Sequence, residues 1–278
     1  MVRAPGRILV ALACEGRVRV LCSVMQGPAD ELRERHVLDR SASLLAAEGL
    51  VAATLLSAHI KGEERLTLDV RSSRPAFAFV ADVDAPGQVR GRFAPATIGP
   101  HRAFAGLLSV AKSLGPKELY RGVAEVRDER FEGALHRYLT TSQQVDARVR
   151  IDADVASDGM VTFAAGLVVE RLPEMAPAEF ASRFDAPLRT DFRGLMTEFA
   201  LGHLAGARLE VLGSQDFVFA CSCSRERVLQ TLRGLGAAEV RGILEEQGRA
   251  EVTCHFCNER YDIGGDELRA LVDALAEH

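Results

Sequence analysis

Apolar and polar positions along the first 172 residues follow strand-like and helix-like patterns in turn. Residues 7–25 hold two apolar stretches around Glu15 and Gly16, which predicts a β-hairpin. Residues 29–59 carry apolar side chains at helical spacing among many alanines, so one long helix or two shorter ones are expected. Residues 65–93 are rich in strand formers and predict an antiparallel meander. Further strands and helices are expected over residues 104–114, 120–126, 131–141, 145–153 and 160–172.

The pattern changes between Pro173 and Pro177. Residues 175–213 look helical, with apolar side chains three to five positions apart at Leu188, Phe192, Leu195, Phe199 and Leu204. Four glycines in this stretch each weaken a helix by roughly 1 kcal/mol relative to alanine. Because such a helix needs a surface to rest on, we predict a helical linker docked on its neighbours.

The last 64 residues form a third segment. We expect a strand over residues 217–220, helices over 226–235 and 238–247, a short hairpin around Cys254, and a last helix capped by Asp266. The chain is therefore predicted to be an α+β protein. Its parts are an amino-terminal α/β core with an antiparallel sheet (1–174), a helical linker (175–213) and a small carboxy-terminal domain (214–278).

Composition and charge narrow the class of protein. Hydrophobic residues make up 47% and charged residues 26% of the 278 residues, which is typical of a globular protein. No apolar run approaches the roughly 20 residues of a membrane span, and the first residues lack the pattern of a secretory signal, so we expect a cytoplasmic protein with no membrane partner. The net charge of -5 argues against a nucleic-acid partner.

Four of the six cysteines form two tight pairs in the tail. Cys221 and Cys223 form a CxC motif, and Cys254 and Cys257 form a CxxC motif thirty residues later. Two close thiol pairs from distant parts of a small domain are what a tetrahedral four-sulfur zinc site requires, so we predict one zinc ion bound by these four residues. His255 is expected to point outward from the CxxC turn.

The other two cysteines, Cys14 and Cys22, lie in the first predicted hairpin and would not face each other across its strands, so we expect ordinary buried thiols there. A domain as small as the tail has little surplus stability from its apolar core, and a structural zinc ion contributes an apparent ~10–16 kcal/mol. The tail is therefore expected to unfold without its metal. A closed four-sulfur site cannot activate water, which leaves a structural role, a redox role or both.

The tail resembles the zinc module of the heat shock 33 kDa chaperonin family, the redox-regulated holdases of the bacterial cytosol. The matching segments are residues 219–228 and 250–261, and a weaker similarity in the expected order extends over nearly the whole chain. The chain departs from the family's pattern at Gln143 and Asp146, and at Arg102, Ala103 and Ala105, where glycines are common. These departures affect the details of the amino-terminal surface and leave the zinc site intact.

The resemblance implies a chaperone that is inactive when reduced and zinc-bound, and active when oxidised and zinc-free. Oxidation is expected to join the near neighbours Cys221 to Cys223 and Cys254 to Cys257, so that zinc must leave. The linker residues Leu188, Phe192, Leu195 and Phe199 would then become available to unfolding client proteins under oxidative stress. The family also suggests a homodimer in the oxidised state. No GxxxxGK[ST] phosphate loop is present, which agrees with an ATP-independent holdase. No Ser/His/Asp constellation or paired-carboxylate motif stands out either, so an enzyme is not expected.

Two other interpretations compete with the holdase. A zinc ribbon that binds nucleic acid would also use four sulfurs, but from Gln215 on the chain has seven Lys plus Arg against twelve Asp plus Glu. A thiol-disulfide oxidoreductase would need its CxxC motif to open a helix after a strand, whereas residues 259–263 look like a strand.

Overall fold

The computed structural model describes residues 3–189 and 191–276, and it confirms the α+β fold. Its contacts divide the chain into two compact units, one up to Ala220 and one from Cys221 on. The boundary follows a strand of the first unit, so residues 214–219, assigned above to the tail, belong to the sheet of the larger unit.

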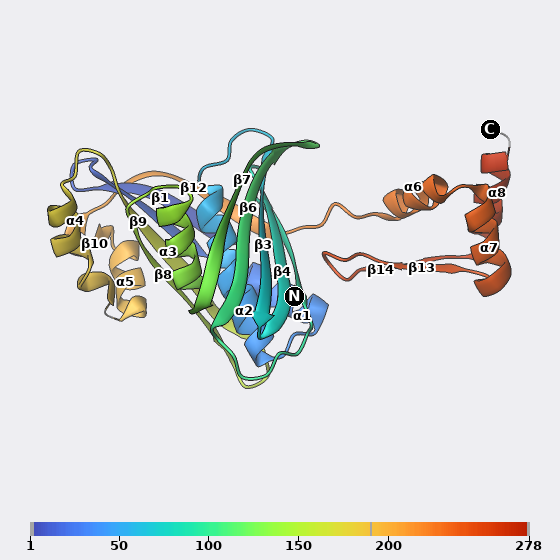
Figure 1. The fold of residues 1–278 in the computed structure, drawn as a ribbon, viewed down its shortest axis with the longest axis horizontal. Coiled ribbons are helices and arrows are strands. Elements are labelled where there is room, and N and C mark those ends of the chain that lie inside the picture. Colours follow the sequence, from blue (N-terminus) through green and yellow to red (C-terminus); the bar gives the residue numbers. More distant parts are fainter. Residues whose placement is uncertain (1–2, 190, 277–278) are drawn as a thin grey trace. The chain divides into compact units, whose positions relative to one another are not determined.

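The described part of the larger unit contains a ten-stranded sheet in the order β7-β6-β3-β4-β5-β12-β1-β2-β9-β8 (Figure 1). Its strands are β1 (Gly6–Ala13), β2 (Val18–Val24), β3 (Glu64–Arg74), β4 (Ala76–Asp84), β5 (Gln88–Ala94), β6 (Phe104–Leu114), β7 (Lys117–Glu129), β8 (Ala147–Val155), β9 (Val161–Arg171) and β12 (Glu210–Phe219). All neighbours are antiparallel except β12 and β5, which are parallel. The predicted hairpin and meander are confirmed as β1–β2 and β3–β5.

Three helices cover one face of this sheet, namely α1 (Gln26–His36), α2 (Arg40–Ser57) and α3 (Phe131–Thr141) (Figure 1). The stretch 29–59 forms two helices because Val37 takes a left-handed conformation that ends α1. Asp39 then accepts a hydrogen bond from the Ala42 amide and starts α2. Every residue of α2 from Ala42 to Ser57 is buried, so this helix forms the centre of the main core.

The predicted linker begins with helices on the opposite face of β1, β2 and β9. They are α4 (Pro177–Phe184), the 3₁₀ turn η1 (Pro187–Arg189) and α5 (Phe192–Ala200). Alternation along β2 sends Leu21 into the main core and Val20 and Cys22 into a second core under α4 and α5. Strands β2 and β9 are therefore buried on both faces, and the linker rests on the larger unit's own sheet.

The helical prediction for the end of the linker is wrong. Residues 203–213 form the short hairpin β10 (His203–Leu204) and β11 (Ala207–Arg208) and the start of β12. Gly202, Ala205 and Gly206 all have positive φ, which ends α5 and closes the hairpin turn. The glycines here redirect the chain rather than weaken a helix.

The smaller unit contains α6 (Arg225–Leu235), α7 (Ala237–Gln247), β13 (Ala250–Thr253), β14 (Arg260–Ile263) and α8 (Gly265–Ala276). The predicted helices and the hairpin around Cys254 are confirmed. Asp266 lies inside the first turn of α8 instead of capping it, since the Leu268 amide bonds the Gly264 carbonyl. Eight buried apolar side chains form this unit's core in the described residues.

The positions that depart from the resembled family have definite partners. Arg102 and Arg130 both bind the carboxylate of Glu48, which lies fully buried in α2. Asp146 accepts from Arg148 and Arg171, and Gln143 donates to the hydroxyl of Tyr138. These residues tie loops to the main core and contribute nothing to the cysteine cluster.

Candidate metal centre

The four cysteines of the smaller unit come from two short segments. Cys221 and Cys223 precede α6, whose amino terminus is capped by the Ser224 hydroxyl. Cys254 and Cys257 lie in the turn between β13 and β14. The Cys254 amide donates to the Glu259 carbonyl at 2.8 Å, and the Asn258 amide donates to the Cys254 carbonyl at 2.9 Å. Asn258 has φ 58°, a left-handed conformation that Asn tolerates well.

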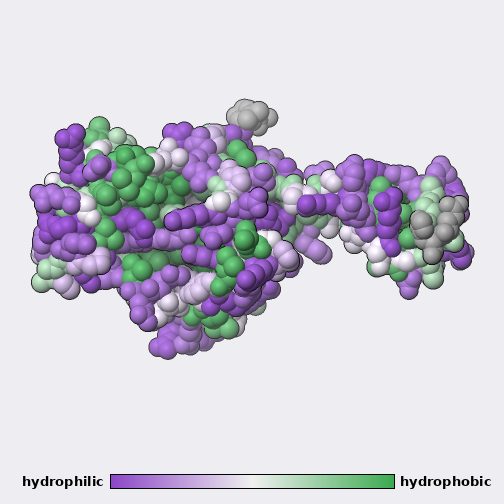
Figure 2. All heavy atoms as spheres, turned by 90° about the horizontal axis from the view of Figure 1, so that it is seen from above, coloured by the Kyte–Doolittle hydropathy of each residue, from purple (hydrophilic) through white to green (hydrophobic). Residues whose placement is uncertain are grey.

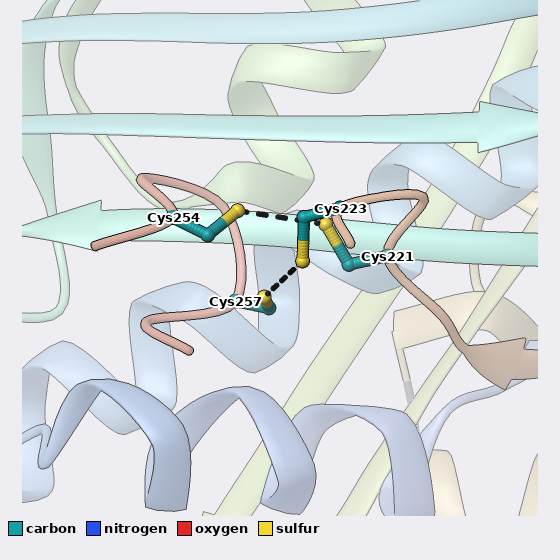
Figure 3. Close-up of side chains that lie close together, drawn as sticks. All are labelled: Cys221, Cys223, Cys254 and Cys257. Atoms are coloured by element: carbon teal, nitrogen blue, oxygen red, sulfur yellow. Dashed lines mark hydrogen bonds between the residues drawn. The ribbon is translucent and has the colours of Figure 1, made fainter. Parts of the chain in front are cut away.

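The four sulfur atoms point toward one another (Figure 3) and all lie within 4.8 Å of each other. The Sγ atoms of Cys221 and Cys254 are 3.7 Å apart, and those of Cys223 and Cys257 are 3.2 Å apart. These distances exceed the ~2.05 Å of a disulfide bond, so no disulfide joins these four cysteines. A tetrahedron with metal–sulfur bonds of ~2.3 Å has edges of about 3.8 Å, and the sulfur separations in the cluster lie on both sides of this value.

The donor set fits a soft or borderline metal ion. The described residues of the cluster are four cysteines and include no carboxylate or imidazole, and His255 is exposed, as its predicted outward orientation requires. Thiolate sets of this kind suit Zn²⁺ rather than Mg²⁺ or Ca²⁺, which prefer oxygen. Four sulfurs would complete a tetrahedral shell, so the cluster offers a closed metal site.

The metal-free thiols have unequal acidity. Burial opposes ionisation of Cys254, but the backbone amides of Cys257 and Phe256 and the neighbouring thiols lower its pKa to about 7. Burial raises the pKa values of Cys223 and Cys257 above the ordinary 9. Cys254 therefore becomes a thiolate, the form that metals and oxidants attack, at lower pH than Cys223 and Cys257 do.

Tyr261 is a residue of this site that the sequence analysis missed. It lies on β14 opposite Val252, and its hydroxyl donates to the Cys223 sulfur at 3.1 Å. Outer-shell donors of this kind orient metal ligands and tune their basicity. The only sequence signal was its position four residues after Cys257, which does not by itself show where the hydroxyl points.

Cys14 and Cys22 take no part in the metal site. Cys14 lies in the turn after β1, whereas Cys22 lies within β2 opposite Leu9, so the two do not face each other, as predicted. The prediction of a buried thiol is confirmed for Cys22 but not for Cys14, which is only partly buried because it lies in the turn. Burial raises the pKa of Cys22 to about 12. Its sulfur lies 3.9 Å from Met196 Sδ on α5, a contact that the sequence did not indicate.

The four apolar linker residues proposed for client binding are all buried. Leu188, Phe192, Leu195 and Phe199 are between 3% and 6% exposed in the second core. Arg150 of β8 contacts this segment at two points. It donates a hydrogen bond to the Leu188 carbonyl, and its guanidinium lies 5.4 Å from the centre of the Phe192 ring. The face of the protein seen in Figure 2 is mainly hydrophilic, with several apolar patches.

A comparison with known protein families matches residues 6–264 to the model described as Hsp33 protein. The chain belongs to the Hsp33 family. The match includes all four clustered cysteines, the whole sheet and the α4–α5 segment.

Curated relatives of the Hsp33 family agree with this assignment. The chain is 31% identical to the 33 kDa chaperonin of Bacillus licheniformis over 96% of its own length and 99% of that protein. It is 32% identical to the 33 kDa chaperonin of Syntrophotalea carbinolica, over 93% and 96% of the two chains. Among solved structures, the Hsp33 homologue of Thermotoga maritima has the same fold, with a TM-score of 0.86, 23% identity and full coverage of both chains.

Proposed function

We propose that this protein is a redox-regulated, ATP-independent holdase that binds unfolding proteins under oxidative stress. The observation that carries the proposal is the convergence of four cysteine sulfurs within 4.8 Å in a small unit whose own apolar core is small. The curated relatives named above are chaperonins. On this proposal the reduced protein, with one zinc ion held by Cys221, Cys223, Cys254 and Cys257, is inactive.

Oxidation acts on the thiols of the cluster. Peroxide takes two electrons from each thiol pair, so that Cys221 bonds Cys223 and Cys254 bonds Cys257, with two molecules of water formed per disulfide. A zinc ion held by these four cysteines would keep their sulfurs deprotonated and would stabilise the unit, and each disulfide would remove two of its ligands. A disulfide between Cys221 and Cys223 closes a small ring, so it is expected to be strained and readily reduced.

Strand β12 provides a route by which the change reaches the linker. It follows β11 in the chain and ends at Phe219, two residues before Cys221. Its last residues pair with β5 only through Val218 with Gln88 and Phe219 with Val89. When the smaller unit unfolds, this short pairing is expected to fray, because strand ends with few hydrogen bonds open most easily.

The surface exposed in the active state would come from the linker and the sheet beneath it. Release of α4 and α5 uncovers Leu188, Phe192, Leu195 and Phe199 together with apolar positions of β1, β2 and β9. Exposed apolar area binds other exposed apolar area without sequence preference, which is what holding diverse clients requires. The same surface is available for a homodimer of the oxidised protein.

Neither rival interpretation gains support from the structure. Cys254 and Cys257 lie in a turn between two strands rather than at the start of a helix, as a thioredoxin-like oxidoreductase would need. The excess of acidic over basic residues from Gln215 on opposes phosphate contacts.

The test is to oxidise purified, reduced and zinc-loaded protein with peroxide under mildly unfolding conditions. We expect zinc release, two disulfides by peptide mapping, and suppression of the aggregation of a thermally unfolding client without ATP. Light scattering on the same samples reports whether a dimer forms. Zinc release without suppression of aggregation would refute the holdase while leaving the metal site intact.

A further inference from the structure

Methionine is placed unevenly in this protein. Of the four methionines that the structure describes, Met25 and Met175 are 0% and 1% exposed, and Met160 is 43% exposed. Met196 is intermediate: it lies on α5 and packs at the edge of the second core. It is the described methionine that is both reachable from solvent and part of the contact between the linker and the sheet.

The immediate surroundings of Met196 are apolar. Its sulfur lies 3.9 Å from the thiol of Cys22 on β2, and the core on this side is formed by side chains such as Leu195 and Phe199. Cys22 itself is 3% exposed and its thiol stays protonated, so it is a poor target for oxidants. The thioether needs no deprotonation to react, which makes Met196 the more reactive sulfur of this pair.

We propose that Met196 is an oxidation site that loosens α5 without loss of metal, so that the linker senses oxidants by a second route. The oxidant is hypochlorous acid. Oxygen is transferred to Sδ, the sulfur loses two electrons, and the chlorine leaves as chloride with a proton. The product is methionine sulfoxide, a polar group with a strong acceptor oxygen.

The sulfoxide disfavours the docked position of α5. A buried acceptor needs a hydrogen-bond donor, and the Cys22 thiol is only a weak one. The oxygen is better solvated when the side chain turns outward, which withdraws it from the second core. Helix α5 has nine residues, too few to be stable without its packing surface, so a weakened contact at one turn increases opening of the whole helix.

The experiment separates methionine from cysteine chemistry by reversal. Full-length, zinc-loaded protein is treated with hypochlorous acid, then with dithiothreitol and fresh zinc, which restores disulfides and sulfenic acids to thiols but leaves methionine sulfoxide. Only samples in which titration recovers all the thiols are used further. Peptide mass spectrometry then locates the sulfoxide, and hydrogen exchange measures opening of α5. We expect sulfoxide at Met196 and about tenfold faster exchange in Phe192–Ala200, with zinc bound throughout.

Matched variants make the result decisive. Met196→Leu should abolish the oxidant effect on α5, whereas Met160→Leu, which changes an exposed methionine outside the linker, should leave it unchanged. Met196→Gln, a polar mimic of the sulfoxide, should speed exchange of α5 without any oxidant. Sulfoxide at Met196 with unchanged exchange, or equal opening in oxidised Met196→Leu, would overturn the proposal.

The oxidation of Met196 and the opening of α5 do not depend on the proposed function, whereas the expectation that an open α5 binds clients rests on it. If α5 opens in Met196→Gln but a client still aggregates, the holdase proposal fails and the oxidation site stands. If α5 stays closed while peroxide still activates the protein, the oxidation site fails and the holdase stands.

Discussion

Residues up to Ala220 bury two apolar clusters on the two faces of a large sheet, whereas the described residues from Cys221 on bury one cluster of eight apolar side chains and gather four thiols. The first unit obtains its stability mainly from buried apolar area, which does not depend on a bound ion. The second has a core too small to supply much surplus, so a bound metal can decide whether it folds. We therefore expect the fold of the second unit, unlike that of the first, to depend on a bound metal.

Removal of the metal should give the largest difference between the two units. We expect a chelator, or the double change Cys254→Ser and Cys257→Ser, to unfold residues 221–276, since structural zinc contributes an apparent ~10–16 kcal/mol. The helices α1 and α2 should keep slow hydrogen exchange. Replacing the non-ligand cysteine, as Cys14→Ser, is the matched control. Slow hydrogen exchange in α6 to α8 of the metal-free protein would show that the smaller unit folds without metal.

Truncation of Phe192, which packs α5 against the sheet, should weaken the packing of the larger unit alone. Phe192 is 5% exposed and its ring meets that of Phe163 at 6.1 Å between centres, so Phe192→Ala should cost about 3–5 kcal/mol of local packing. We expect faster exchange in α5 and partial holdase activity in the reduced protein with zinc still bound. Leu201→Ala, at a side chain 73% exposed, should have no effect on either measurement.

Loss of the Tyr261 hydroxyl should affect the smaller unit alone. Tyr261→Phe removes the hydrogen bond to Cys223, and outer-shell changes of this kind weaken metal binding about 10- to 100-fold. Competition with a zinc chelator measures the change. Tyr120→Phe, in the larger unit, should leave zinc affinity unaltered, and an equal loss in both variants would show that the Tyr261 contact has no specific role.

Acidification should lower the free energy of unfolding of the larger unit through protonation of Glu170. Burial opposes ionisation of Glu170, but the His59 ring and the Arg19 charge hold its pKa below the ordinary 4.5. The folded state therefore binds this proton less readily than the unfolded state, so the stabilisation is complete above pH 4.5 and is lost as the pH falls through the folded value.

Glu170→Gln should lower the stability of the larger unit by about 2 kcal/mol at pH 7 and flatten the loss below pH 4.5. Urea unfolding of the larger unit at a series of pH values measures this. An unchanged acid profile would show that Glu170 does not contribute.

Local patterns determined much of this protein. The hairpin β1–β2, the meander β3–β5 and the helices of the tail follow from periodicities of two and 3.6 residues that each segment carries by itself. The CxC and CxxC spacing predicted that the four cysteines lie together, because a tetrahedral four-sulfur site needs two such pairs. The helical prediction failed at the glycines after α5. Their positive φ values belong to a hairpin turn, which depends on the pairing of β10 with β11.

Tertiary structure alone decided how distant segments meet. The sequence indicated that α5 needed a surface, but the contact of Met196 with Cys22 depends on the pairing of strands more than a hundred residues apart. Likewise β12 joins β1 to β5 through a register that no local pattern contains, and the Tyr261 hydroxyl reaches a cysteine 38 positions away. Periodicity fixes which face of an element is apolar, whereas the partner of that face is chosen by the packing of the whole chain.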